Sequence, residues 1–193
     1  MKKGGWSDEF VHHWKYYLAT ARASPSDLDF LKEKIMEKGK SCSVLILGSA
    51  PEYRNLCGQL GIKATIIDFR KYNYEYLGKE VRKKSRECFF EADWLSAPLG
   101  KKFDIILGDN VINVISKKHT LILLHNISEM LRDDGLFLPR SYVRDNAEHY
   151  TPEKIISEYR GRKQCLSLYT ATNRGLYLAA YDFKLDRLFL KDV

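Results

Sequence analysis

Short apolar runs recur through the middle of the chain, with segments of helical length between them. Each run has five or six residues and is apolar on both faces, and the runs lie at 44–48, 64–69, 88–92, 103–108 and 135–139. Such runs are typical of strands buried on both sides in a parallel sheet. The intervening segments predict helices at about 52–60, 73–84 and 117–133. This alternation predicts an α/β fold with a doubly wound sheet and helices on both faces.

The helix predicted at 117–133 has the clearest pattern. Ser116 is a candidate N-cap, and Gly135 is a candidate for the end of the helix. Apolar residues recur at helical spacing between them, at Leu121, Leu124, Ile127 and Leu131. We expect this stripe to be the apolar face of the helix, with His125 on the opposite, solvent-facing side.

The two ends of the chain differ from the middle. Residues 7–40 predict two helices, the first rich in aromatic residues and the second beginning after Ser24-Pro25-Ser26. Residues 151–161 predict a further helix. The apolar stretches 166–172 and 176–183 are separated by Asn173-Arg174-Gly175, which is a hairpin signal. We therefore expect a mostly parallel sheet that ends in an antiparallel C-terminal hairpin.

Composition narrows the class of protein. The 193 residues suit one domain, and 45% hydrophobic with 30% charged residues excludes wholesale disorder. No apolar run reaches the roughly 18 residues of a membrane helix, and the N-terminus lacks the apolar core of a secretory signal. The four cysteines form no C-x-x-C pair, and the histidines show no metal-ligand spacing. We expect a cytoplasmic protein with reduced cysteines, no membrane segment and no metal site.

The net charge of +7 raises the question of nucleic acid binding. The excess is spread as +2, +2 and +3 over residues 1–43, 44–150 and 151–193, so the chain has no basic arm or tail. The densest basic cluster comprises Lys79, Arg82, Lys83, Lys84 and Arg86. A solvated helix face explains this cluster at least as well as a phosphate-binding surface does.

The candidate chemistry lies at the carboxyl ends of the predicted strands, where open α/β sheets bind their ligands. The first strand ends in Gly48-Ser49-Ala50-Pro51-Glu52, and the second in Asp68-Phe69-Arg70. The third ends in Asp93-Trp94, and the fourth in Gly108-Asp109-Asn110. Asp68 follows Gly48 by 20 residues, which is about the spacing at which an acidic side chain meets a ribose.

The loop at Gly48 is a poor match for a dinucleotide. Such a loop needs three glycines so that backbone amides can approach a pyrophosphate. Here Ala50 replaces the second glycine, Pro51 contributes no amide hydrogen, and Glu52 places a carboxylate beside the phosphates. A ligand with an adenosine and no phosphate avoids these losses. S-adenosylmethionine, which carries a sulfonium cation, is such a ligand.

The ordered set of these segments resembles the class I S-adenosylmethionine-dependent methyltransferases, and more narrowly small methyltransferase-like proteins with a Gly-x-x-Pro-Glu loop. The matching pieces cover most of residues 14–145. They are SPSDL (24–28), LILGSAPEYRNL (45–56), IIDF (66–69), ADWL (92–95), FDIILGDNVINVI (103–115) and LRDDGLFLPRSYVR (131–144). The resemblance implies a Rossmann-like, seven-stranded sheet in a single domain (1–193). It would comprise an N-terminal helical lid (1–40), a cofactor-binding core (41–145) and a C-terminal helix and hairpin (146–193).

The resemblance also implies roles for the strand-end residues. Gly48, Ser49, Ala50 and Pro51 would contact the cofactor, Asp68 with Phe69 its ribose, Asp93 with Trp94 its adenine, and Gly108, Asp109 and Asn110 would face its methyl group. Each has a plain structural alternative: a turn residue for Asp68, a capping aspartate with a core tryptophan for Asp93 and Trp94, and loop capping for Asp109 and Asn110. The Asn/Asp-Pro-Pro-aromatic signature of exocyclic-amine methylation is absent, because Asp109-Asn110-Val111-Ile112 stands in its place.

Three further features are candidates. Arg22 would bind the cofactor carboxylate or remain a solvated arginine. Trp6, Trp14, Tyr16 and Tyr17 would form a lid over a sulfonium or belong to the core. His149 follows the fifth predicted strand and, like Asp109, would accept a proton from a hydroxyl or amine acceptor.

These observations predict methyl transfer to an acceptor that the sequence does not identify. A chain of this length has no room for a separate substrate domain, which favours a small molecule over a long polymer. Two alternatives remain open. One is a methyltransferase-fold module without catalysis; the other is an RNA methyltransferase that uses Lys83, Lys84, Arg160 and Arg162. The sequence gives no indication of oligomeric state.

Overall fold

The computed structural model describes residues 8–17, 21–96 and 99–141, and a few positions beyond them: 151, 153, 157, 160, 181–182 and 187–188. The chain divides into two compact units, one of residues 1–15 and 19–142 and the other of residues 16–18 and 143–193. The first unit holds the sheet and the strand-end residues identified above.

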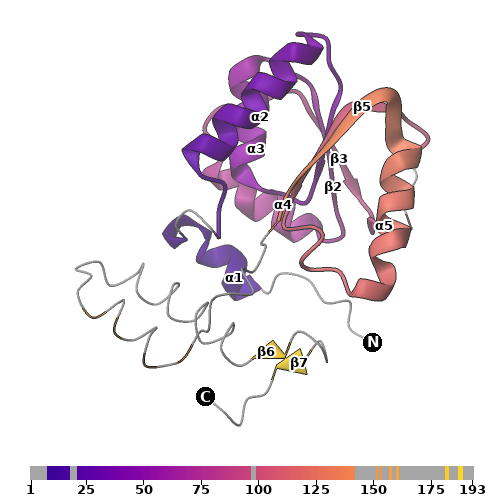
Figure 1. Ribbon diagram of the computed structural model, residues 1–193. Coiled ribbons are helices and arrows are strands. Elements are labelled where there is room, and N and C mark those ends of the chain that lie inside the picture. The colour runs from indigo at the N-terminus through magenta and orange to yellow at the C-terminus, as the bar shows by residue number, and fades with distance from the viewer. Residues whose placement is uncertain are drawn as a thin grey trace. The chain divides into compact units, whose positions relative to one another are not determined.

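The first unit is built on a five-stranded parallel sheet with the strand order β3-β2-β1-β4-β5 (Figure 1). Its strands are β1 (Val44–Leu47), β2 (Ala64–Asp68), β3 (Glu87–Glu91), β4 (Phe103–Asp109) and β5 (Leu131–Arg140). All five apolar runs are therefore strands, as predicted. The chain order reverses between β1 and β4, so the carboxyl ends of these two strands flank the point where doubly wound sheets bind ligands.

Helices cover both faces of the sheet. They are α1 (Asp8–His12), α2 (Pro25–Lys38), α3 (Pro51–Leu60), α4 (Lys71–Leu77) and α5 (Lys117–Met130), with short 3-10 turns at Trp14–Tyr16 and Gly78–Glu80. Helices α2 and α3 lie on one face and α5 on the other (Figure 1). Because successive strand residues point to opposite faces, Val44 and Ile46 pack with α2 and α3, whereas Leu45 and Leu47 pack with α5.

The start of α2 follows the sequence prediction closely. The Ser24 hydroxyl accepts the backbone N–H of Asp27, and the Asp27 carboxylate accepts the backbone N–H of Ser24. Pro25 occupies the first helical position, where no amide hydrogen is needed. This reciprocal capping satisfies two backbone donors that the first turn would otherwise leave without partners.

The buried face of α5 differs from the predicted one, because the buried residues are shifted by about one position along the sequence. The buried residues are Leu123, Ile127 and Met130, whereas the side chain of Leu121 is 79% exposed and that of Leu124 is 39% exposed. Five apolar residues crowd into the segment 121–127, so two helical stripes are available there. Packing against the sheet selects the stripe that continues to Met130.

The predicted end of α5 at Gly135 is also wrong. The helix stops at Met130, and the chain enters β5 directly at Leu131. Leu131 pairs with Phe103, and the next paired residues are Leu136 and Ile105, so residues 132–135 form an irregularity in the ladder. Gly135 lies inside this irregularity, where a Cβ atom would come within 2.9 Å of the Arg132 carbonyl oxygen. The glycine is therefore part of a bulge in β5 and does not cap a helix.

The helix predicted at 73–84 is shorter than expected. Helix α4 ends at Leu77 and the following 3-10 turn at Glu80, so Arg82, Lys83, Lys84 and Arg86 lie in a non-helical loop. Asn55 on α3 holds this loop, because its Oδ1 accepts the backbone N–H groups of Arg82 (2.7 Å) and Lys83 (3.0 Å). The reading of these basic residues as a solvated helix face is therefore incorrect.

The second unit contains one described ladder, in which β6 (Tyr181–Asp182) pairs antiparallel with β7 (Arg187–Leu188). Most of the predicted hairpin at 166–183 lies outside the described residues, as does most of the predicted helix at 151–161. The seven-stranded sheet and the single domain of residues 1–193 therefore remain predictions.

Candidate functional site

The loop after β1 begins with a glycine whose backbone no other residue type adopts easily. Gly48 has φ = 91°, and its N–H donates to the Ile67 carbonyl at 2.8 Å. Ser49, Ala50 and Pro51 follow it, all buried, and Pro51 opens α3. Ala50 occupies the N-cap position without a side-chain cap. The N-terminus of α3 thus lies directly after the loop, with its positive partial charge at the carboxyl edge of the sheet.

Asp68 ends β2 beside this loop. Its side chain is 3% exposed; Oδ2 accepts the Ser49 hydroxyl at 2.7 Å and Oδ1 accepts the Arg70 N–H at 3.0 Å. Burial raises the pKa of the Asp68 carboxyl, against the lowering effect of these hydrogen bonds. Phe69 follows it in a half-buried position. The structure thus joins Asp68 to the Gly48 loop, and the ribose contact that the 20-residue spacing predicts remains a prediction.

Asp93 and Trp94 close the turn after β3. The Asp93 carboxylate accepts the Leu95 N–H at 3.0 Å, which is a local capping contact. The Trp94 indole N–H donates to the Ile67 carbonyl at 3.1 Å, and a Cβ placed on Gly48 would lie 3.6 Å from its ring. The structure therefore gives Asp93 a local capping contact and places the half-buried Trp94 against the Gly48 loop, while the adenine contacts of both residues remain a prediction.

Glu52, in the first turn of α3, is a second buried carboxylate at this edge. It is 8% exposed, and its Oε1 accepts the Trp14 indole N–H at 3.2 Å and the Arg22 Nε–H at 2.6 Å. The other carboxylate oxygen, Oε2, is buried without a hydrogen-bond partner among the described residues. The guanidinium of Arg22 is thus engaged by Glu52, and Trp14 is an interior residue. Trp6 lies outside the described residues.

Asp109 ends β4 next to the β1 loop. It is 4% exposed; its Oδ1 accepts the Nε–H of Arg140, the last residue of β5, at 2.8 Å, and forms an ion pair with Nη2 of the same side chain at 2.5 Å. Burial raises the pKa of the Asp109 carboxyl to about 6; Arg140 opposes this rise, and the charges of Glu52 and Asp27 add to it. A carboxylate with this pKa is mostly ionised at neutral pH and still accepts a proton readily.

The turn after Asp109 is tightly constrained. A Cβ atom at Gly108 would come within 2.6 Å of a Val111 methyl group, so the chain folds back closely over position 108. Asn110 has φ = 56°, which makes it the one non-glycine residue of the described chain with a left-handed backbone. Its N–H donates to the Arg140 carbonyl at 2.8 Å. Such strain is common at ligand-binding positions.

Four buried polar atoms at this edge lack hydrogen-bond partners among the described residues: Glu52 Oε2, Asp109 Oδ2, Asn110 Oδ1 and the Tyr53 hydroxyl. Tyr53, on α3, is fully buried, and burial together with the nearby Asp109 charge raises the pKa of its phenol. Buried polar groups are normally paired, so a group of unpaired ones indicates a place where a ligand completes the bonding. His149, the third catalytic candidate, lies outside the described residues.

Comparisons with known proteins give the architecture a precedent. The sequence matches no protein-family model and no curated protein. The fold is similar to the CcbJ methyltransferase from Streptomyces caelestis, with a TM-score of 0.56 and 12% identity over 67% of this chain and 54% of that one. It is also similar to the glycopeptide N-methyltransferase MtfA complexed with sinefungin, with a TM-score of 0.50 and 19% identity over 58% of this chain and 52% of that one. The core has the methyltransferase fold. The chain spans about half the length of these two structures.

Sequence reasoning missed two residues of the candidate site, Tyr53 and Arg140. Tyr53 and Arg140 lie in segments that contributed to the resemblance, yet no local pattern marks either as part of the site. Their positions depend on β5 pairing beside β4, where Asp109 is in register with Arg140. A buried Arg–Asp pair across two strand ends becomes visible only once that register is known.

A cavity of about 480 Å³ opens beside these two residues in the methyltransferase fold. It lies between the start of α2 and the end of β5, and apolar side chains such as Phe30 and Phe137 line it together with Tyr53, Arg140 and Asp27. A mainly apolar hollow with a few polar groups is typical of small-molecule sites. In the described part of the chain, no helix is long and apolar enough to span a bilayer. No cluster of His, Cys, Asp or Glu suits a metal ion among those same residues.

Proposed function

We propose that this chain is an S-adenosylmethionine-dependent methyltransferase that acts on a small molecule. The observation that carries the proposal is the carboxyl edge of the sheet. It combines the Gly48 loop, the buried Asp68 carboxylate bound to that loop, and unpaired polar atoms at Asp109 and Asn110. The shared fold supports it, because MtfA is a methyltransferase of this fold whose structures include complexes with sinefungin and with S-adenosylmethionine.

The residues at this edge fit the cofactor. A carboxylate has about four lone-pair sites, and those of Asp68 that Ser49, Arg70 and Asn73 do not use would accept ribose hydroxyls. Gly48, with no side chain, leaves room for the ligand beside Trp94, while Ser49, Ala50 and Pro51 form the wall before α3. Phe69, Asp93 and Trp94 would bound the adenine, and Gly108 would allow close approach at β4. Arg22 would bind the cofactor carboxylate only by sharing its guanidinium with Glu52.

The residues of β4 and β5 then act on the acceptor. When bound, the cofactor supplies a methyl group on a sulfonium that an aligned nucleophile displaces. Arg140 holds Oδ1 of Asp109, which leaves Oδ2 free to take the proton that a hydroxyl or amine acceptor loses. Asn110 offers a side-chain carbonyl oxygen beside it, and the cavity at Tyr53 would orient the acceptor. Alignment of donor and acceptor contributes about 7 to 11 kcal/mol in such reactions.

Calorimetry of cofactor binding tests the proposal. We expect S-adenosylmethionine and its demethylated product to bind at micromolar affinity, and Asp68→Asn to weaken binding by about tenfold or more, since a charge-assisted hydrogen bond is lost. Asp134→Asn is the matched control, because its carboxylate is exposed and pairs with Lys38 on the surface. It should leave the affinity unchanged. Tight binding of NAD with no binding of S-adenosylmethionine would refute the proposal.

A further inference from the structure

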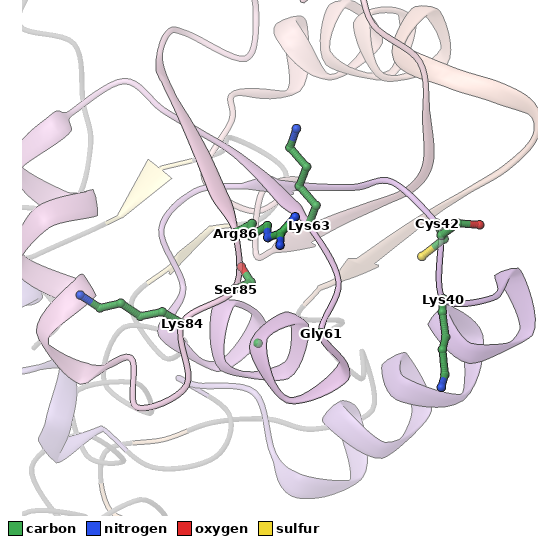
Figure 2. Close-up of a pocket in the computed structure, with 9 residues that line it drawn as sticks. Lys40, Cys42, Gly61, Lys63, Lys84, Ser85 and Arg86 are labelled. Atoms are coloured by element: carbon green, nitrogen blue, oxygen red, sulfur yellow. The ribbon is translucent and has the colours of Figure 1, made fainter.

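A second hollow lies at the opposite edge of the sheet, where the strands begin. It has a volume of about 530 Å³, which lies in the usual range for small-molecule sites. Cys42, Lys63 and Arg86 come shortly before or at the starts of β1, β2 and β3, and all three line it, together with Gly58 and Gly61 at the end of α3 (Figure 2). The cofactor loop lies at the carboxyl ends of the same strands, so this hollow is separate from the site proposed above.

Four cationic side chains surround this hollow: Lys40, Lys63, Lys84 and Arg86. None of the four forms an ion pair within the described part of the chain. In Figure 2 the side chains of the three lysines extend in different directions. No ion pair of the described residues therefore balances the charge on this hollow.

The neighbouring carboxylates are already committed to other partners. Glu87, at the start of β3, has a side chain that is 8% exposed and binds Arg54 through both oxygens, at 3.1 Å and 2.8 Å. Asp104 accepts the Ser43 N–H and hydroxyl, and it pairs with Arg132. The partial negative charge at the end of α3 is also partly met, because the N–H groups of Gly61 and Ile62 donate to its last carbonyls. Neither of these two carboxylates is therefore available to balance the four cations.

The loop that carries Lys84 and Arg86 is fixed in place. Asn55 on α3 accepts hydrogen bonds from the loop backbone at Arg82 and Lys83. The loop packs so closely on α3 that a Cβ atom at Gly58 would come within 1.9 Å of the Lys83 carbonyl oxygen. Ser85, between the two cations, lines the hollow, and its hydroxyl oxygen is buried without a hydrogen-bond partner among the described residues. A hydroxyl donor among fixed cations is the arrangement that binds phosphate oxygens.

We propose that this hollow binds a phosphate-bearing small molecule of nucleotide size. The cations surround one concavity and do not form a stripe along a face, which favours a compact ligand over a nucleic acid strand. Lys63 and Arg86 neutralise the phosphate charge, Lys40 and Lys84 close the rim, and the Ser85 hydroxyl donates to a phosphate oxygen. The hollow is at the edge of the sheet opposite Asp109. A ligand bound there therefore cannot place the methyl-accepting atom at Asp109, and it acts as a regulator or as another part of the substrate.

Calorimetry of the full chain with uridine diphosphate, pyrophosphate and uridine tests this proposal. The demethylated cofactor is present at saturation, so that the Gly48 site is filled. We expect both phosphate compounds to bind, uridine to bind far more weakly, and added salt to weaken the binding. In the double variant Lys63→Glu/Arg86→Glu, affinity should fall by about tenfold or more, and Ser85→Ala should lower it less. Both charged side chains are exposed, so their replacement leaves the core intact.

Lys117→Glu/Lys118→Glu on α5 is the control for net charge, since both are exposed lysines on the other face of the sheet and the two changes alter the net charge by the same amount. It should change the affinity by less than about twofold. Equal loss in this control, or no binding of either phosphate compound, would overturn the proposal. So would binding of a short single-stranded RNA that depends on Lys63 and Arg86 when uridine diphosphate does not bind. Cofactor affinity, measured separately, should be unchanged in every variant, which keeps this result independent of the proposed methyltransferase function.

Discussion

Asn110 shows how a single residue joins backbone strain to chemistry. Its left-handed φ of 56° turns the chain sharply after β4, and the same residue presents a buried, unpaired side-chain oxygen beside Asp109. Asparagine tolerates this conformation better than other residues with side chains, and glycine tolerates it best. The residue at this position therefore satisfies a backbone requirement and offers a polar group at once.

Substitution at Asn110 separates these two contributions. We expect Asn110→Gly to have about the same free energy of unfolding as the native chain. Asn110→Ala should have a free energy of unfolding lower by about 1 kcal/mol, because alanine is sterically strained in the left-handed region. Urea denaturation of the two variants measures the difference. Since both lack the amide, the comparison isolates the backbone effect. Equal stability of the two variants would show that φ at position 110 relaxes freely.

Sequence reasoning located the carboxylates of the site and missed their partners. Asp68 and Asp109 were found because each follows an apolar run that predicts a strand, and parallel strands bring their carboxyl ends to one edge. The Arg22–Glu52 and Arg140–Asp109 pairs each join residues 30 or 31 positions apart in the chain. No local pattern encodes such a contact, because it depends on the order and register of the strands. The roles proposed for the site residues remain to be tested by binding.

At the scale of an element, α5 shows where hydrophobic periodicity fails. The segment 121–127 offers two overlapping apolar stripes, and the sequence gives no reason to prefer the buried one. Packing against the sheet determines which stripe is buried, because Leu123, Ile127 and Met130 contact its apolar face together with Leu45 and Leu47. A similar limit explains the basic loop at 81–86, where contacts from Asn55 override an otherwise helical pattern.

Two alanine variants of α5 test the register of this helix. Leu123 is fully buried, whereas Leu121, two residues earlier, is 79% exposed. We expect Leu123→Ala to lower the free energy of unfolding by about 2–5 kcal/mol and Leu121→Ala to change it by less than about 0.5 kcal/mol. Chemical denaturation of both variants provides the measurement. A larger loss of stability in Leu121→Ala than in Leu123→Ala would indicate that the stripe predicted from the sequence is the buried one.

For the whole molecule, the alternation of strands and helices was predictable, and the five central strands are where the pattern placed them. This succeeded because strands that are buried in a parallel sheet have short, continuous apolar runs in the sequence. The strand order and the bulge at 132–135 are not encoded locally. They follow from how the crossovers pack, with α2 and α3 on one face and α5 on the other.

The molecule should be more stable in mildly acidic solution than at neutral pH. Asp68 and Asp109 are buried, and both carboxyl pKa values are raised in the folded chain, that of Asp109 to about 6 from 3.8. Between these two pKa values the folded state binds more protons than the unfolded state, so stability falls as pH rises. For Asp109 the gain from pH 7 to pH 5 is about 1 kcal/mol. The lowered pKa values of Asp104 and Asp134 oppose this only below their unfolded value of 3.8.

Urea denaturation at several pH values between about 5 and 7 measures this dependence. The native chain should gain stability as the pH falls, and Asp109→Asn should flatten the curve, because the variant has no proton to gain at this position. Asp134→Asn, a change at the surface, should keep the native slope. A native chain that loses stability over this range would show that the ion pair with Arg140 outweighs the burial of Asp109.

The close approach at Gly58 makes the second hollow depend on a missing side chain as much as on its charges. Any larger residue there would push the backbone of residues 83 and 84 away from α3, and with it the cations that follow. A related sequence could therefore keep every lysine and arginine of the cluster and still lack the concavity. In comparing homologues, a glycine at the end of this helix together with the basic loop would mark those that retain the pocket, which the basic residues alone would not.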